Sequence, residues 1–124
     1  MASPNKKHGY FDVVKVLLDN GAKIDAKDNF GNTALLKASS NGQMEVVKLL
    51  LDKSATVDTK NNQDITPLLM AASKGDVEIV KLLLAKGANP NAAMKGSKPW
   101  TPLTIAEENK FTDVIELLQK AVKR

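Results

Sequence analysis

The chain has 124 residues, of which 43% are hydrophobic and 26% charged, so it is long enough to bury one core and has an ordinary globular composition. It has no cysteine, which excludes disulfides and thiolate chemistry and suits a reducing compartment. The net charge of +4 comes from dispersed lysines, and Arg124 is the sole arginine, unlike the concentrated basic stripe of a nucleic-acid binder. With neither a signal-like start nor a membrane-length apolar run, we expect an intracellular protein, cytoplasmic or nuclear and not secreted, with no nucleic-acid or membrane partner.

The first predicted element follows a polar start. Only four residues separate Pro4, a residue that commonly begins a helix, from Gly9, which is expected to end one, and none of the four is apolar. Residues 13–18 then carry apolar side chains at helical spacing, and Gly21 ends this second helix. We therefore expect the first unit, residues 1–27, to be truncated and to lack a stable first helix.

The second unit, residues 28–60, predicts a pair of helices. Thr33 is a suitable N-cap for a short first helix, which Gly42 ends. Residues 46–51 place apolar side chains on one stripe of the second helix. The polar stretch 22–32 before the pair is long enough for an extended β-turn that projects from the stack.

The third unit, residues 61–93, repeats this pattern with a period of 33 residues. Thr66 is followed by proline, which is tolerated at the first position of a helix. Gly75 ends the first helix and Gly87 the second. Asp64 stands where the second unit has a turn glycine, and we expect it to accept the positive φ, since Asp visits this region more readily than most residues.

The fourth unit, residues 94–124, starts its first helix at Thr101 and turns polar and basic at its end, as a capping repeat does. Thr101 lies 35 residues after the preceding helix start, so its turn is two residues longer. Counting back from Thr101 places Gly96 at the turn position held by aspartate in the second unit, and Pro99 at the position held by glycine. Because proline cannot adopt a positive φ, we expect this turn to be built differently.

The repeated pattern resembles the ankyrin repeat, D-x-x-G-x-T-P-L-H-x-A-A-x-x-G followed by V-V-x-L-L-L and G-A-x-x-N-A. Residues 61–93 match it almost throughout, and the resemblance extends over residues 9–124. It implies an all-α fold, an ankyrin-repeat solenoid of stacked antiparallel helix pairs with projecting β-turns. The histidine of the motif is replaced by Leu36, Leu69 and Thr104, so the hydrogen bonds that it makes in the family are not expected here.

The resemblance also implies a contact surface for another protein. The turn tips and the exposed sides of the first helices would form a concave groove whose residues are free to specify a partner. The predicted partner-binding residues are Asn29, Phe30, Asn32, Ser40, Asn41, Asn62, Gln63, Ile65, Ser73, Lys74, Ser97, Lys98, Trp100, Glu108 and Asn109.

Three members of this set are large and apolar. Phe30, Ile65 and Trp100 would each be costly to leave in water, by about 1.5–3 kcal/mol relative to burial. Interfaces concentrate their binding energy in such anchors, with tryptophan foremost. The alternative for each is that it folds back over its own loop, and for Trp100 the sequence leaves open a lid over the enlarged turn or a partner anchor.

The sequence offers no convergent set of catalytic or metal-ligating groups. His8 is the only histidine and has no partner in sequence that would make it a base or a ligand. We therefore predict a non-enzymatic interaction scaffold without cofactor or metal, and favour a monomer. The alternatives are an engineered or truncated solenoid that self-associates through its short N-terminal repeat, and a targeting module cut from a larger protein.

Overall fold

The computed structural model describes residues 6–122 of the protein, and within that range the chain forms seven α-helices and no strand. In chain order the helices are α1 (Lys6–Asp19), α2 (Ala34–Ser40), α3 (Met44–Asp52), α4 (Pro67–Lys74), α5 (Val77–Ala85), α6 (Pro102–Glu108) and α7 (Thr112–Val122).

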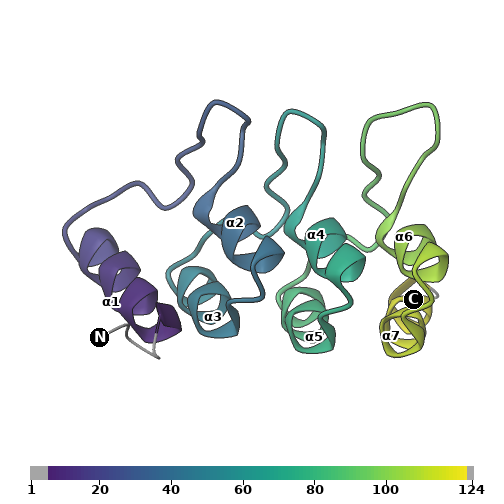
Figure 1. Cartoon of the computed structure of the whole chain (residues 1–124). Helices are drawn as coiled ribbons and strands as arrows, with labels where there is room; N and C mark the ends of the chain where they lie inside the picture. Colours follow the sequence, from purple (N-terminus) through teal and green to yellow (C-terminus); the bar gives the residue numbers. More distant parts are fainter. Residues whose placement is uncertain (1–5, 123–124) are drawn as a thin grey trace.

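The helices stack in two rows. In Figure 1, α2, α4 and α6 form the upper row, α3, α5 and α7 form the lower row, and three long loops project from the edge of the upper row. Each upper helix packs on the lower helix that follows it and on the upper helices beside it. The prediction of an all-α solenoid built from antiparallel helix pairs is confirmed.

A threonine begins each helix of the upper row, as predicted. The hydroxyl oxygens of Thr33, Thr66 and Thr101 accept hydrogen bonds from the backbone N–H three residues later, at 3.3, 3.2 and 3.2 Å. Thr104 returns the interaction, because its Oγ1 accepts the Thr101 N–H at 2.8 Å. These bonds satisfy backbone donors that a helix N-terminus otherwise leaves without partners.

The core consists of aliphatic side chains from both rows. Leu50, Leu83 and Leu118 occupy the same place in three successive lower helices, and each is fully buried. Ala38 and Ala71 are equally buried in upper helices, where a small side chain lets neighbouring helices approach closely. The periodic leucines and alanines of the repeat therefore form the continuous interior that stacked units need.

The first helix differs from the prediction. Gly9 was expected to end a short helix, but α1 runs from Lys6 through Gly9 to Asp19 without interruption. A glycine inside a helix costs only about 1 kcal/mol relative to alanine, so the following apolar helix extends through it. Val14 of α1 is buried against the stack, whereas Leu17 is 54% exposed.

The helices α1 and α5 are each followed by a glycine with positive φ, Gly21 and Gly87, whereas α3 ends differently. Ser54 has a φ of 72°, at the position where α5 is followed by Gly87 with a φ of 89°. A left-handed conformation costs a residue with a Cβ atom roughly 1–2 kcal/mol. The end of α3 therefore carries backbone strain that the end of α5 does not.

Replacing Ser54 by glycine is expected to raise the free energy of unfolding by about 0.5–1 kcal/mol, since relief of strain exceeds the extra entropy lost by glycine. The reciprocal change Gly87→Ser should lower it by a similar amount, because a Cβ atom at Gly87 meets no other atom within 4 Å and would add only strain. Urea unfolding followed by circular dichroism measures both. A loss of stability in Ser54→Gly would contradict the prediction.

Candidate functional site

The first projecting turn, residues 28–32, is held together by hydrogen bonds to its first residue, Asp28. Asp28 donates its N–H to the Asn32 carbonyl at 3.0 Å. Asp28 Oδ1 in turn accepts the N–H groups of Phe30 and Asn32, both at 2.9 Å. Such side-chain-to-backbone bonds define an Asx-type turn, and they hold the backbone of Phe30 in one conformation.

The second turn, residues 61–65, is built in the same way with an amide in place of the carboxylate. Asn61 donates its N–H to the Ile65 carbonyl at 3.1 Å. Asn61 Oδ1 accepts the N–H groups of Gln63 and Ile65 at 2.9 and 3.1 Å. Asp64 has a φ of 61°, which confirms the prediction that it accepts the conformation of the turn glycine.

The carboxylate of Asp28 is stabilised in its charged form. The hydrogen bond from the Asn32 N–H is the main cause that holds the pKa of Asp28 below its usual value. Lys37 adds to this, since its Nζ lies 3.1 Å from Asp28 Oδ2. Partial desolvation acts in the opposite direction but does not outweigh the donors.

Asp28→Asn is expected to keep the first turn and to weaken the acid sensitivity of the fold. Asn61 shows that an amide makes the same two hydrogen bonds. Because the folded pKa is lowered, the contribution of Asp28 is present above the unfolded value of about 3.9 and is lost as the pH falls through the folded value. Urea unfolding from about pH 6 down to about pH 2 should show the two proteins converging in acid. A stability difference independent of pH would refute this.

The turns are joined to one another through their backbones. The Asn62 N–H donates to the Phe30 carbonyl at 3.0 Å, and Asn62 Nδ2 donates to the Asn29 carbonyl at 3.1 Å. One unit later, the Lys95 N–H donates to the Gln63 carbonyl at 2.9 Å. The three turns therefore form a hydrogen-bonded ladder, and their tips are held in fixed register.

The third turn is larger, and its register differs from the prediction. Met94, not Gly96, donates its N–H to the carbonyl of Trp100, at 3.0 Å, and so takes the place of the opening residue of the other turns. The two extra residues lie between this pair. Trp100 also donates its N–H to the Lys98 carbonyl at 2.9 Å, which closes a tight bend around Pro99. As expected, this turn is built differently from the other two.

The three predicted anchors have different surroundings. Phe30 is 71% exposed at the tip of the first turn. Ile65 and Trp100 are half-buried, and both immediately precede a helix-capping threonine. Lys98 Nζ lies 4.7 Å from the centroid of the Trp100 ring, a cation–π distance. Trp100 is thus partly covered by its own turn, whereas Phe30 presents its ring to solvent.

The remaining predicted residues lie either on the turns or at the C-terminal ends of the upper-row helices. Asn29, Asn62, Gln63, Ser97 and Lys98 are exposed on the turns, and Asn32 is half-buried at the end of the first turn. Ser40, Asn41, Ser73, Lys74, Glu108 and Asn109 lie at or just beyond the C-terminal ends of α2, α4 and α6, and each is half-buried or exposed. All the predicted residues are therefore accessible.

A surface depression of about 140 Å³ brings several of them together between α2 and α4. It is lined by Asn32, Leu36, Lys37, Ser40, Asn41 and Met70. Lys37 and Met70 were not predicted as contact residues. Helical spacing in the sequence could have identified Lys37, because it lies four residues before Asn41 and therefore on the same face of α2.

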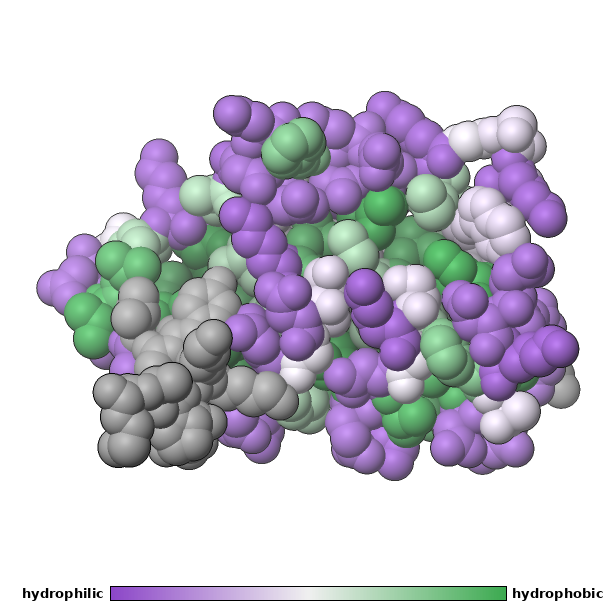
Figure 2. Space-filling model, in the orientation of Figure 1, coloured by the Kyte–Doolittle hydropathy of each residue, from purple (hydrophilic) through white to green (hydrophobic). Residues whose placement is uncertain are grey.

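Figure 2 shows a mixed surface: the turns are mainly polar, and apolar residues emerge in the band beneath them. Among residues 6–122, no cluster of histidine, aspartate or glutamate side chains is arranged to hold a metal ion. None of the helices in this part of the chain is long and apolar enough to cross a membrane.

Comparison with known proteins places this arrangement in a family. The family model described as ankyrin repeats (3 copies) matches residues 2–94 and 61–123 of the chain. A comparison with curated proteins gave no match. Proteins of the matching family are generally protein–protein interaction modules and typically non-enzymatic. From the family match, the stacked helix pairs and the repeated turns, we conclude that the chain belongs to the ankyrin-repeat family.

Proposed function

We propose that this protein is a non-enzymatic scaffold that binds a partner protein along the groove side of the stack, meaning the three turns and the exposed sides of α2, α4 and α6. The observation that carries this proposal is Phe30, whose side chain is 71% exposed although its backbone is held on both sides. Its N–H is bound by Asp28 Oδ1 and its carbonyl by the Asn62 N–H.

A rigid exposed aromatic side chain is suited to binding. Burying a ring of this size is worth about 1.5–3 kcal/mol. Because the turn backbone is already ordered, little conformational entropy is lost when a partner covers the ring. The polar residues beside it, Asn29 and Asn62, are placed to form the hydrated rim that surrounds such anchors.

The depression between α2 and α4 supplies a complementary recess. It is lined by the fully buried Leu36 and the half-buried Met70, and by the exposed Lys37 and Asn41. A volume of about 140 Å³ suits one partner side chain and not a whole small molecule, since ligand pockets usually exceed about 300 Å³. Together with the turns, this supports a footprint near about 800 Å² on this chain.

The test is affinity capture with matched variants of the full chain. Phe30→Ala/Ile65→Ala/Trp100→Ala removes the three groove-side anchors. Val16→Ala/Leu17→Ala removes exposed apolar side chains of comparable character from α1, outside the groove. A genuine partner is retained by wild type and by the α1 variant and is lost with the triple variant. Equal retention by a triple variant whose circular dichroism matches wild type would refute the groove proposal.

A second candidate, self-association through α1, is favoured by one observation. Val16 and Leu17 are 57% and 54% exposed, and Figure 2 shows apolar surface over this helix. An exposed apolar patch favours pairing with a second copy. Sedimentation equilibrium should then show a mass that rises with concentration and becomes monomeric in Leu17→Asp. A wild-type monomer at all concentrations excludes this candidate.

A further inference from the structure

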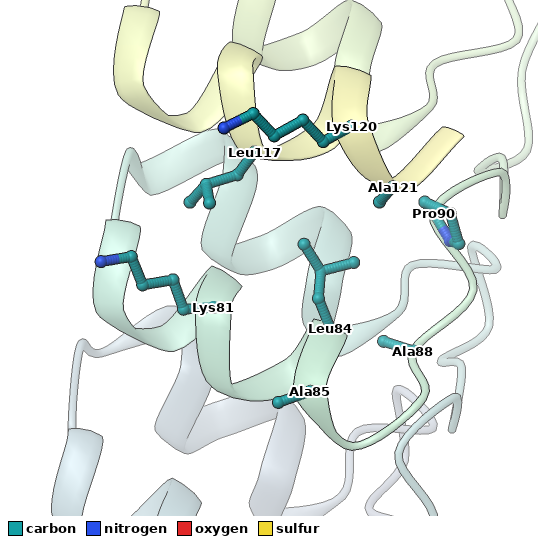
Figure 3. Close-up of a pocket in the computed structure, with 8 residues that line it drawn as sticks. All are labelled: Lys81, Leu84, Ala85, Ala88, Pro90, Leu117, Lys120 and Ala121. Atoms are coloured by element: carbon teal, nitrogen blue, oxygen red, sulfur yellow. The ribbon is translucent and has the colours of Figure 1, made fainter. Parts of the chain in front are cut away.

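A second recess lies on the opposite row of helices. It is a cleft of about 360 Å³ between α5 and α7, away from the turns (Figure 3). Leu84 of α5 and Leu117 of α7 project into it from its two sides. Both side chains are only half-buried, so they form apolar walls that remain accessible.

Ion pairs cross the two preceding junctions between second helices, from α1 to α3 and from α3 to α5. Lys53 Nζ lies 3.7 Å from Asp19 Oδ1, which links the end of α1 to the end of α3. Lys86 Nζ lies 3.9 Å from Asp52 Oδ1, which makes the same link between α3 and α5. The aspartates and the lysines of the two pairs are each 33 residues apart, so one interaction is repeated along the row.

The repeat of this ion pair is missing at the α5–α7 junction. The residue 33 positions after Asp52 is Ala85, and the residue 35 positions after Lys86 is Ala121, where the two additional positions come from the longer third turn. Both alanines line the cleft. The aspartate and the lysine that pair across the other junctions are therefore replaced here by methyl groups that leave the cleft wall unfilled.

The cleft has a charged end and an apolar end. In Figure 3 the ammonium groups of Lys81 and Lys120 point to the same side, and Pro90 and Ala121 lie at the other. Both lysine side chains are exposed. Lys81 is only loosely engaged, with its Nζ 3.9 Å from Glu78 Oε1, whose side chain is 70% exposed. An exposed pair of this kind contributes little and is readily exchanged for another carboxylate.

We propose that this cleft docks an acidic–apolar segment of a protein. A leucine-sized side chain of that segment lies between Leu84 and Leu117, and a neighbouring aspartate or glutamate pairs with Lys81 and Lys120. The occupant is a polypeptide because the cleft is open along its length and walled by two helices, so it covers one side of a chain but does not enclose a small ligand. This site is independent of the groove side, and with both in use the scaffold bridges two proteins.

The test selects 12-residue peptides from a random displayed library on the full wild-type chain. Selected peptides are expected to combine Asp or Glu with Leu, Ile or Phe. Their affinity is then measured by fluorescence polarisation on three variants. Ala85→Asp/Ala121→Lys restores the ion pair found at the other junctions and fills the cleft, so binding should be lost. Lys81→Gln/Lys120→Gln leaves the apolar walls and should weaken binding by about tenfold.

The third variant, Phe30→Ala/Ile65→Ala/Trp100→Ala, should bind the selected peptides with unchanged affinity, which separates this proposal from the groove proposal. Circular dichroism of each variant confirms that the helices persist. Unchanged binding by Ala85→Asp/Ala121→Lys, or selected peptides without acidic residues, would overturn the inference. Binding of decanoate at the cleft in place of any selected peptide would assign a small amphiphile and would equally overturn it.

Discussion

Leu50→Ala is expected to lower the free energy of unfolding by about 3 kcal/mol, whereas Leu17→Ala, 33 residues earlier, should lower it by less than about 1 kcal/mol. The two leucines occupy the same position of the repeated helix. Leu50 is fully buried between the two helix rows, while Leu17 is 54% exposed. Truncating Leu50 leaves a cavity, and truncating Leu17 removes contacts that are largely with water.

Urea unfolding of both variants, followed by circular dichroism, measures the difference at one temperature and protein concentration. The concentration matters because association through α1 would bury Leu17 and raise its apparent contribution. Equal losses for the two variants in a monomeric sample would contradict the exposure of α1 in the structure.

Gly31→Ala is expected to lower the free energy of unfolding by about 2–3 kcal/mol, compared with about 1 kcal/mol for Gly21→Ala. Both glycines have positive φ, 80° and 90°, so both variants carry similar backbone strain. A Cβ atom at Gly21 meets nothing within 4 Å, but at Gly31 it would lie 2.9 Å from the backbone nitrogen of Asn62. The excess loss at Gly31 therefore measures the close contact between the first two turns.

The same substitution is expected to disturb the groove side. The Asn62 N–H donates to the Phe30 carbonyl, so displacing Asn62 loosens the turn that carries the exposed ring. Amide hydrogen exchange at Asn62 should accelerate in Gly31→Ala and remain unchanged in Gly21→Ala. Identical stabilities for the two variants would show that the contact between the turns contributes nothing.

The sequence was sufficient for features that depend on neighbours in the chain. Helix starts at Thr33, Thr66 and Thr101 follow from local capping chemistry, in which a hydroxyl reaches a backbone N–H three residues away. The buried leucines follow from helical periodicity, because a 3.6-residue repeat assigns one stripe to the interior. The positive φ of Asp64 follows from its alignment with a turn glycine.

The tertiary structure decided what depends on distant segments. The spacing from Thr101 placed Gly96 at the opening of the third turn. In the structure Lys95 instead donates the hydrogen bond to the Gln63 carbonyl of the second turn, and Met94, one residue earlier, opens the third turn. The continuation of α1 through Gly9 likewise reflects a cooperative helix overriding one unfavourable residue.

The two recesses on the surface could not be predicted from the sequence. Periodicity identified Leu84 and Leu117 as apolar residues of second helices but not as the walls of a cleft. That cleft is lined by Ala85 and Ala121, which are 36 residues apart in sequence and stand where the earlier junctions have an ion pair. The repeat pattern determined the fold because its interactions are local and repeated. Only the packed structure determined the surfaces, because each surface is formed by side chains from different units.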